Sequence, residues 1–191
     1  SMRPVTSLAM ALIVPLWVPL LVVAQALSST GSGQDVGKLL DDLKNGDAKV
    51  RQSAVGELAR LDSRAAWEAI ADRALTDLEP RVADEAQLQI GRASWSKALG
   101  DMLESKSALG ARSVLVRERS AEALGSVLGA VPAGIFATAL KDKEASVRAA
   151  AAFALEKRLA NGPSALDLSD SKGLTALRKV LARAATSDRD A

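Results

Sequence analysis

Three arginines hold equivalent places in the chain and are the most regular of its chemically active side chains. Arg51, Arg117 and Arg148 each follow a valine directly. A row of guanidinium groups could bind carboxylates or phosphates of a ligand through paired hydrogen bonds. The same groups could instead pair with acids inside the protein, because Asp47 and Asp142 lie close by in the sequence. We favour the internal role, since the arginines follow the period of the chain.

The composition excludes most catalytic machinery. The 191 residues contain no His, no Cys and no Tyr, so Ser-His-Asp and Cys-His catalysis and thiolate zinc sites are impossible. Adjacent acids such as Asp41-Asp42 and Asp84-Glu85 point about 100° apart on a helix and cannot readily share a proton or a metal ion. The 25 basic and 23 acidic residues nearly balance, which argues against a nucleic-acid binder. We predict no catalytic residue, no metal and no cofactor.

A period of slightly more than thirty residues organises the chain after about residue 35. Val50, Val82, Val116 and Val147 are separated by 32, 34 and 31 residues. A small residue follows each valine by four positions and a large aliphatic residue by eight: Ala54, Ala86, Ser120 and Ala151, then Leu58, Ile90, Leu124 and Leu155. These offsets mark one stripe of an α-helix. A leucine seven residues before each valine indicates a second helix in every unit, at Leu43, Leu75, Leu109 and Leu140.

Two of the four units resemble a known repeat. The stretches Gly46–Ala54 (GDAKVRQSA) and Lys143–Ala151 (KEASVRAAA) are similar to HEAT repeats, in particular the short units of the phycobilisome-lyase-like type. The resemblance covers about residues 35–160. The second unit departs from it with Ala83 in place of arginine, and the third carries an irregular insertion, Ser105–Ser113. The resemblance implies a short α-solenoid whose arginines bond to acids and carbonyls of the adjacent repeat, and it says little about function.

The N-terminal segment is strongly apolar. Arg3 is the only ionisable residue before Asp35, and Leu8–Leu27 is a run of 20 residues, long enough to cross a membrane as a helix. The residues that define this run are Leu8, Leu12, Pro15, Trp17, Pro19 and Val23. A cleavable signal peptide is the alternative, with Ala24 and Ala26 as the small residues of the cleavage site. We predict a retained helix with its N-terminus in the cytoplasm, because the flanking positive charge stays inside.

These patterns divide the chain into four parts. Residues 1–27 are the signal-anchor or transmembrane helix, 28–34 a flexible linker, 35–162 the HEAT-like repeats, and 163–191 a C-terminal capping helix and tail. The last helix has one apolar face formed by Leu174, Leu177, Val180 and Leu181. A terminal cap with one polar side is what a stack of repeats requires. The expected fold is therefore all-α, with about four hairpins between a membrane helix and a cap.

Two tryptophans are the candidate partner contacts. Trp67 and Trp95 lie 28 residues apart, in the predicted first helices of the second and third units. A tryptophan in an Ala-rich stack can fill a gap between layers, or it can anchor a protein interface when it is partly exposed. Both interpretations stay open, and the two residues are our candidates for a partner-facing surface.

The sequence favours a non-enzymatic, membrane-anchored protein–protein interaction module. We expect an accessory or stabilising subunit of a larger membrane complex, such as a respiratory or photosynthetic one. It would cross the cytoplasmic (inner) membrane once, with its globular domain on the periplasmic side. Expected partners are the membrane and integral membrane proteins or a soluble periplasmic protein, but neither nucleic acid nor metal. The second hypothesis is a soluble secreted periplasmic binding protein released by cleavage at Ala26. The third hypothesis is a lyase-like enzyme.

Overall fold

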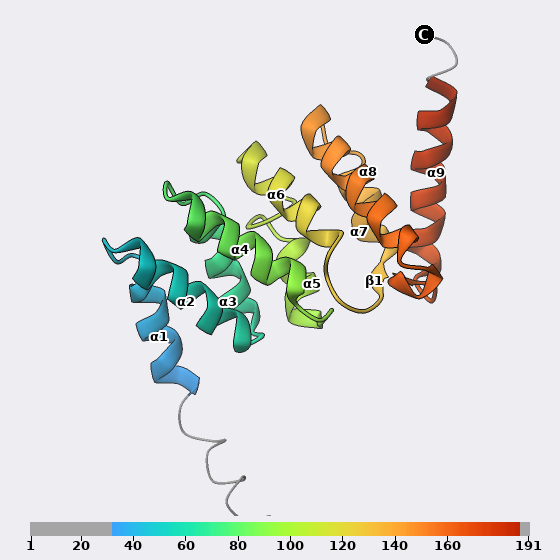
Figure 1. Cartoon of the computed structure of the whole chain (residues 1–191). Coiled ribbons are helices and arrows are strands. Elements are labelled where there is room, and N and C mark those ends of the chain that lie inside the picture. The colour runs from blue at the N-terminus through green and yellow to red at the C-terminus, as the bar shows by residue number, and fades with distance from the viewer. Residues whose placement is uncertain (1–31, 188–191) are drawn as a thin grey trace, which may run out of the picture. The chain divides into compact units, whose positions relative to one another are not determined.

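The computed structural model describes residues 32–187, which are mostly helical (Figure 1). The all-α class expected from the sequence is therefore confirmed for the described part of the chain. The chain divides into two units, Ser1–Gly33 and Gln34–Ala191. The elements described here belong to the second unit, apart from the first two residues of α1.

Nine α-helices follow one another within residues 32–187. They are α1 (Ser32–Asp42), α2 (Ala48–Arg60), α3 (Arg64–Ala69), α4 (Pro80–Arg92), α5 (Lys97–Leu103), α6 (Val114–Leu124), α7 (Ala133–Ala139), α8 (Ala145–Ala160) and α9 (Ser171–Ser187). A π-helical turn, Ile70–Ala74, continues α3, and a 3-10 turn, Pro163–Ala165, precedes α9. Several helices begin where a side-chain oxygen accepts a backbone N–H of the first turn. Asp47 does so for α2, and Ser63, Ser96 and Ser113 do so for α3, α5 and α6.

The helices alternate between two layers. The helices α2, α4, α6 and α8 lie side by side in one row, each packed on the next (Figure 1). We call them the stripe helices, because they carry the four periodic valines. In the other layer α3 packs on α5, and α7 packs on α9. Each stripe helix thus follows a shorter helix along the chain.

The core lies between the two layers and contains the periodic stripe. Val82 and Val147 are fully buried, and so are the aliphatic residues eight positions later in α2, α4 and α6, namely Leu58, Ile90 and Leu124. Val50 is only half-buried, because no stripe helix precedes α2. Many of the buried residues are alanines, and their small side chains let neighbouring helices pack closely.

Short parallel bridges join the loops at one edge of the stack. The strand β1 (Val131–Pro132) pairs with β2 (Leu166–Asp167), and Ser94 pairs with Leu128 in the same way. We call this the β edge. These loops recur about once per repeat, so their backbone groups lie opposite one another and bond across the repeats. The sequence pattern did not predict these pairings.

Asp170 anchors α9 to the rest of the stack at the β edge. Its Oδ1 accepts the N–H of Gly173 at 2.8 Å, in the first turn of α9. Its Oδ2 accepts the N–H of Gly134 at 3.0 Å, in the first turn of α7. One carboxylate therefore caps two helices, and a Cβ on Gly173 would overlap both that carboxylate and the Gly134 nitrogen. This contact fixes the cap helix predicted for residues 163–191 against α7.

Two boundaries differ from the sequence prediction. The helix α1 begins at Ser32, so the last three residues of the expected linker, 32–34, are helical. Small polar residues are acceptable there because the first turn of a helix has no intrahelical acceptors for its N–H groups. Trp95 lies in the loop before α5 rather than in a helix, since Ser96 caps α5 and sets its start.

Glycines set the distance between stripe helices and give a test of the packing. A Cβ on Gly125 would lie 3.0 Å from Cα of Ala154 in α8, and the φ angle of −64° at Gly125 suits any residue. We expect Gly125→Ala to lower the free energy of unfolding by about 1–3 kcal/mol, because α6 and α8 must separate. Denaturant titration followed by circular dichroism measures this change.

Gly56 in α2 is the matched control. Its nearest neighbour to an added Cβ is Nε2 of Gln89 at 4.0 Å, so Gly56→Ala has room. Alanine is the better helix former, and this variant should gain about 0.5–1 kcal/mol. Equal effects of the two substitutions would contradict close packing of α6 on α8.

Candidate interaction surface

Arg51 joins α2 to the loop that precedes α4. Its Nε donates to Oδ2 of Asp77 at 2.7 Å, and its Nη2 donates to Oδ1 at 2.8 Å. Its Nη1 donates to the carbonyl oxygens of Asn45 and Gly46 at 2.8 and 3.1 Å, just before α2. One guanidinium therefore ties the loops in front of two successive stripe helices. The predicted nearby acid, Asp47, instead caps α2 by accepting the N–H of Lys49.

Arg117 repeats this arrangement between α6 and α8. Its Nε and Nη2 donate to the two carboxylate oxygens of Asp142 at 2.7 and 3.1 Å. Its Nη1 donates to the carbonyl oxygens of Ala111 and Arg112 at 2.9 and 3.2 Å. The side chain of Arg117 is only 5% exposed and that of Asp142 11%. This bidentate pair is thus largely removed from water.

The ion pairs shift the ionisation of their members. Hydrogen bonding to the arginines lowers the pKa of Asp77 and of Asp142 below the ordinary value, although burial opposes the shift. Hydrogen bonding to the carboxylates raises the pKa of Arg51 and of Arg117 above the ordinary value. All four groups are charged at neutral pH, so the pairs hold the stack together over the whole physiological range.

The second unit lacks the arginine–aspartate pair, and Arg119 of α6 makes a different contact in this region. Ala83 stands at the arginine position of α4 and is fully buried. The loop before the next stripe helix, α6, contains the insertion Ser105–Ser113. This loop has no aspartate at the place that Asp77 and Asp142 occupy before α4 and α8. Arg119 of α6 crosses this region instead, and its Nη1 donates to the carbonyl oxygen of Leu75 at 2.7 Å.

Arg148 keeps only half of the arrangement. Its Nη1 donates to the carbonyl oxygens of Asp142 and Lys143, each at 2.9 Å, just before α8. Among residues 32–187 it makes no ion pair with a carboxylate. The side chain is exposed, and no further stripe helix follows α8 in the described part of the chain.

A fifth arginine, Arg158, has a structural role that the sequence pattern did not predict. Arg158 of α8 is 4% exposed, and its guanidinium donates to the carbonyl oxygens of Val127, Gly129 and Ala165. Burial lowers the pKa of Arg158, since it has no carboxylate partner among the described residues. It ties the α6–α7 loop to the α8–α9 loop at the β edge. Its position does not follow the period, so no sequence signal identified it.

The two tryptophans occupy different environments. Trp67 is 2% exposed, and its Nε1 donates to Oδ1 of Asp62 at 2.8 Å. Of the two alternatives for Trp67, this placement agrees with the packing role, because the indole is buried in the core. Trp95 is half-buried, and its ring lies against Gly100. Its backbone N–H donates to the carbonyl oxygen of Leu128 at 2.7 Å, so Trp95 belongs to the β edge.

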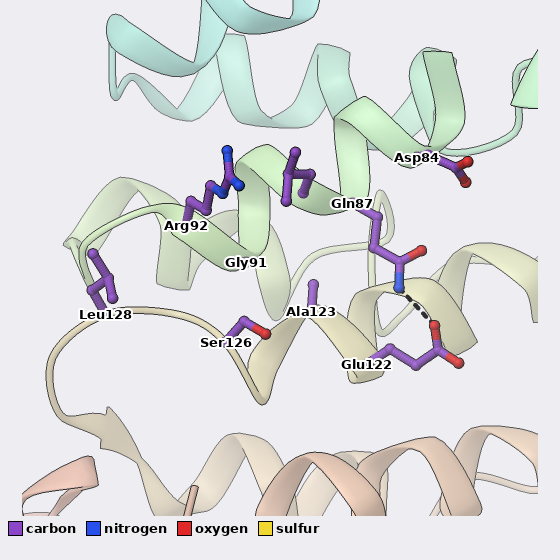
Figure 2. Close-up of a pocket in the computed structure, with 9 residues that line it drawn as sticks. Asp84, Gln87, Gly91, Arg92, Glu122, Ala123, Ser126 and Leu128 are labelled. Carbon is purple, nitrogen blue, oxygen red and sulfur yellow. Dashed lines mark hydrogen bonds between the residues drawn. The ribbon is translucent and has the colours of Figure 1, made fainter. Parts of the chain in front are cut away.

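A groove of about 420 Å³ lies between α4 and α6 (Figure 2). The lining residues are Asp84, Gln87, Leu88, Gly91, Arg92, Glu122, Ala123, Ser126 and Leu128. Nε2 of Gln87 donates to Oε2 of Glu122 at 2.6 Å across one end of the groove, while Arg92 and Leu128 lie at the other end (Figure 2). Leu88 and Leu128 are 40% and 56% exposed. The groove can therefore accept an apolar side chain with polar groups on both sides of it.

The exposed side of the stripe helices carries one further apolar side chain, Phe153, in register with this groove. Leu88, Glu122 and Phe153 each lie six residues after a periodic valine, on α4, α6 and α8. Phe153 is 66% exposed. Glu122 alone of the three is charged, and it is held by Gln87. This side of the row therefore presents apolar and polar groups at a fixed spacing, and we call it the stripe-helix face.

Several expectations concern residues outside the described part. The predicted membrane run and its possible cleavage site, including Leu8, Pro15, Trp17, Ala24 and Ala26, lie outside residues 32–187. Among the described helices none is both long and apolar enough to span a bilayer. In the same part of the chain, no three acidic residues converge as metal ligands would.

Comparison with known proteins adds no family. No family model matches the chain, and no curated protein matches it. The likeness to HEAT repeats therefore depends on the sequence of the units, and function must be argued from this chain's own surfaces.

The buried ion pair makes stability dependent on pH. We expect Asp142→Asn to destabilise the protein by roughly 2–4 kcal/mol at pH 7, because Arg117 keeps its charge and loses its counter-ion. The native pKa of Asp142 lies below the unfolded value of about 3.9, so its contribution is complete above that pH. The contribution is lost as the pH falls through the lower native pKa. The difference between the two proteins should therefore shrink below about pH 4.

Urea unfolding at pH 7, 5 and 3 measures this difference. Asp84→Asn is the control, since Asp84 is exposed and its substitution should change stability by less than about 0.5 kcal/mol. A difference for Asp142→Asn that is the same at pH 7 and pH 3 would show that the pairing does not stabilise the fold.

Proposed function

We propose that the protein is a non-enzymatic protein–protein interaction module, built as a short α-solenoid of HEAT-like hairpins. The periodic valines, the hairpin order and the arginine–aspartate ties between consecutive units support this architecture. A stack of this kind offers a large surface of fixed spacing rather than one deep pocket. Its role would be to hold partner proteins, as an accessory or stabilising subunit does.

The observation that carries the proposal is the exposed apolar content of the stripe-helix face. Leu88 and Phe153 lie on the stripe-helix face and are 40% and 66% exposed, and Leu128, in the loop after α6, lines the groove beside this face and is 56% exposed. Apolar groups set among polar ones are typical of surfaces that bind another protein. The regular arginines do not compete for this role, because Arg51 and Arg117 are committed to internal aspartates.

The N-terminal sequence supports a location at the membrane. We infer that residues 1–27 anchor the module in the cytoplasmic membrane and that the repeats lie on the periplasmic side, because Arg3 alone flanks the apolar run. The partners would then be integral membrane proteins or the periplasmic proteins bound to them. A soluble binding protein, released after Ala26, is the second candidate and depends on the same residues.

Extraction from the native membrane in mild detergent tests both location and function. We expect an intact mass that includes residues 1–26, together with co-eluting integral membrane proteins. The double variant Leu88→Asp/Leu128→Asp should lose the co-eluting proteins, because two charges would enter the groove. Its far-ultraviolet circular dichroism and melting temperature should stay close to wild type, since both side chains are already exposed.

Leu168→Asp is the matched control. Leu168 is 62% exposed and lies between β2 and α9, outside the groove. Co-elution that survives in the double variant would contradict the groove as the binding surface. A purified mass that lacks residues 1–26 would favour the soluble alternative.

A further inference from the structure

The next stripe helix covers one side of each of α2, α4 and α6. In α2, α4 and α6 this side is formed by the residues one, five and nine positions after the periodic valine. The set is Arg51, Val55 and Ala59, then Ala83, Gln87 and Gly91, then Arg117, Ala121 and Gly125. The residues at the last position come close to the following helix: a Cβ on Gly91 would lie 3.5 Å from the carbonyl oxygen of Ala123 in α6, and a Cβ on Gly125 would lie 3.0 Å from Cα of Ala154 in α8. Val55, Ala83 and Ala121 are fully buried by this contact.

The same side of α8 is uncovered in the described part of the chain. Arg148, Ala152 and Glu156 hold the equivalent positions, and all three are exposed. The helix α9 packs on α7 in the other layer and leaves this place open. Leu159 is 53% exposed, next to Leu181 of α9 at 44%. We call the surface formed by these five residues the α8 end face.

The α8 end face is hollow and mainly apolar. A pocket of about 470 Å³ is lined by Leu140, Ala152, Leu155, Glu156, Leu159, Ala160 and Leu181. Arg148 lies one turn before Ala152 on α8, outside the lining of this pocket, and its Nη1 is already held by two carbonyl oxygens. In Arg51 and Arg117 the same Nη1 contacts accompany a carboxylate on Nε and Nη2. Arg148 is therefore oriented for a carboxylate that residues 32–187 do not supply.

We propose that the α8 end face binds an α-helix of a partner protein, and that a carboxylate just before this helix pairs with Arg148. The proposal deepens the interaction function inferred above and depends on it. The partner helix would run parallel to α8, as α8 runs beside α6, because Asp142 precedes α8 and pairs with Arg117 near the start of α6. It would present small apolar side chains to Ala152 and a basic side chain to Glu156. It would lie farther from α8 than α8 lies from α6, because Glu156 stands where Gly125 lets Ala154 come close.

The need for a carboxylate at Arg148 distinguishes a separate partner protein from a second copy of this chain and from its N-terminal segment. In a second copy stacked end to end, the residue five positions before the first periodic valine would meet Arg148, and that residue is the neutral Asn45. The N-terminal segment of this chain has no acidic residue before Asp35. A separate helical partner with an acidic residue before its first turn satisfies the chemistry of the face.

A peptide that copies this chemistry is available from the chain itself. The segment Leu140–Asn161 contains Asp142, the α8 stripe and the basic Lys157, and it packs on the equivalent side of α6 in the structure. We expect the fluorescein-labelled peptide to bind the full-length protein in mild detergent, with saturation measured by fluorescence anisotropy. Arg148→Gln in the protein, or Asp142→Asn in the peptide, should each weaken binding about tenfold. Both changes together should cost little more than one.

The controls separate the outcomes. Lys143→Gln removes an exposed positive charge beside the face and should leave binding unchanged, whereas Leu159→Asp should abolish it. Absence of saturable binding, or equal effects of Arg148→Gln and Lys143→Gln, would overturn the proposal. Asp188 and Asp190 of the C-terminal tail also carry carboxylates. If the double variant Asp188→Asn/Asp190→Asn tightens peptide binding tenfold, the carboxylate comes from this chain and a partner is not needed. Self-association by light scattering that depends on Arg148 would overturn it in favour of a second copy.

The two functional inferences fail in distinguishable ways. The detergent co-purification responds to Leu88→Asp/Leu128→Asp in the groove, and the peptide titration responds to Arg148 and Leu159 at the end face. Co-elution that survives Leu88→Asp/Leu128→Asp, together with peptide binding that depends on Arg148 and Leu159, would exclude the groove only. Negative peptide binding with intact co-purification would remove the end face and leave the interaction function in place.

Discussion

The bidentate bond between Arg117 and Asp142 joins three parts of the fold at once. The guanidinium belongs to α6, the carboxylate to the loop before α8, and the carbonyl oxygens on Nη1 to the loop before α6. A buried charge of this kind is favourable only when all its donors and acceptors are matched. The spacing and the rotation of α8 on α6 are therefore restricted by one side chain. Arg51 applies the same restriction between α2 and α4.

The two edges of the stack are stabilised by different chemistry. At one edge, arginines and aspartates pair across successive repeats. At the β edge, backbone groups bond directly, and side chains such as Asp170 and Arg158 bind loop backbone from two repeats. Asp62 also contributes there, because its carboxylate accepts both the indole N–H of Trp67 and the hydroxyl of Ser96. Together the two sets of contacts hold hairpins whose helices are as short as six residues.

The sequence predicts the periodic part of this structure and little of the rest. The four valines and their followers locate the stripe helices, because burial of one side repeats with the helical period. The repeat pattern also predicts that Asp142 pairs with an arginine, although the actual partner, Arg117, is 25 residues away. Arg158 and the β edge depend on loops brought together only by the stacking. Trp67 lies in the apolar core, and Asp62, at a positive φ of 41°, accepts its indole N–H, a contact that the sequence pattern does not show.

The interface between successive stripe helices repeats along the chain, and within residues 32–187 the corresponding side of α8 is uncovered. Three features of the side of α6 that α8 covers recur on α8 itself: the arginine held by two carbonyls, a small residue four positions later, and an apolar group further along. Glu156 is the difference, since the equivalent positions in α4 and α6 are Gly91 and Gly125. A glycine admits any close helix, whereas a carboxylate at that point rejects an acidic one and selects a basic one. The α8 end face is thus more selective than the interfaces between the stripe helices. A surface that binds a separate partner must discriminate between partners, whereas a contact inside one chain need not.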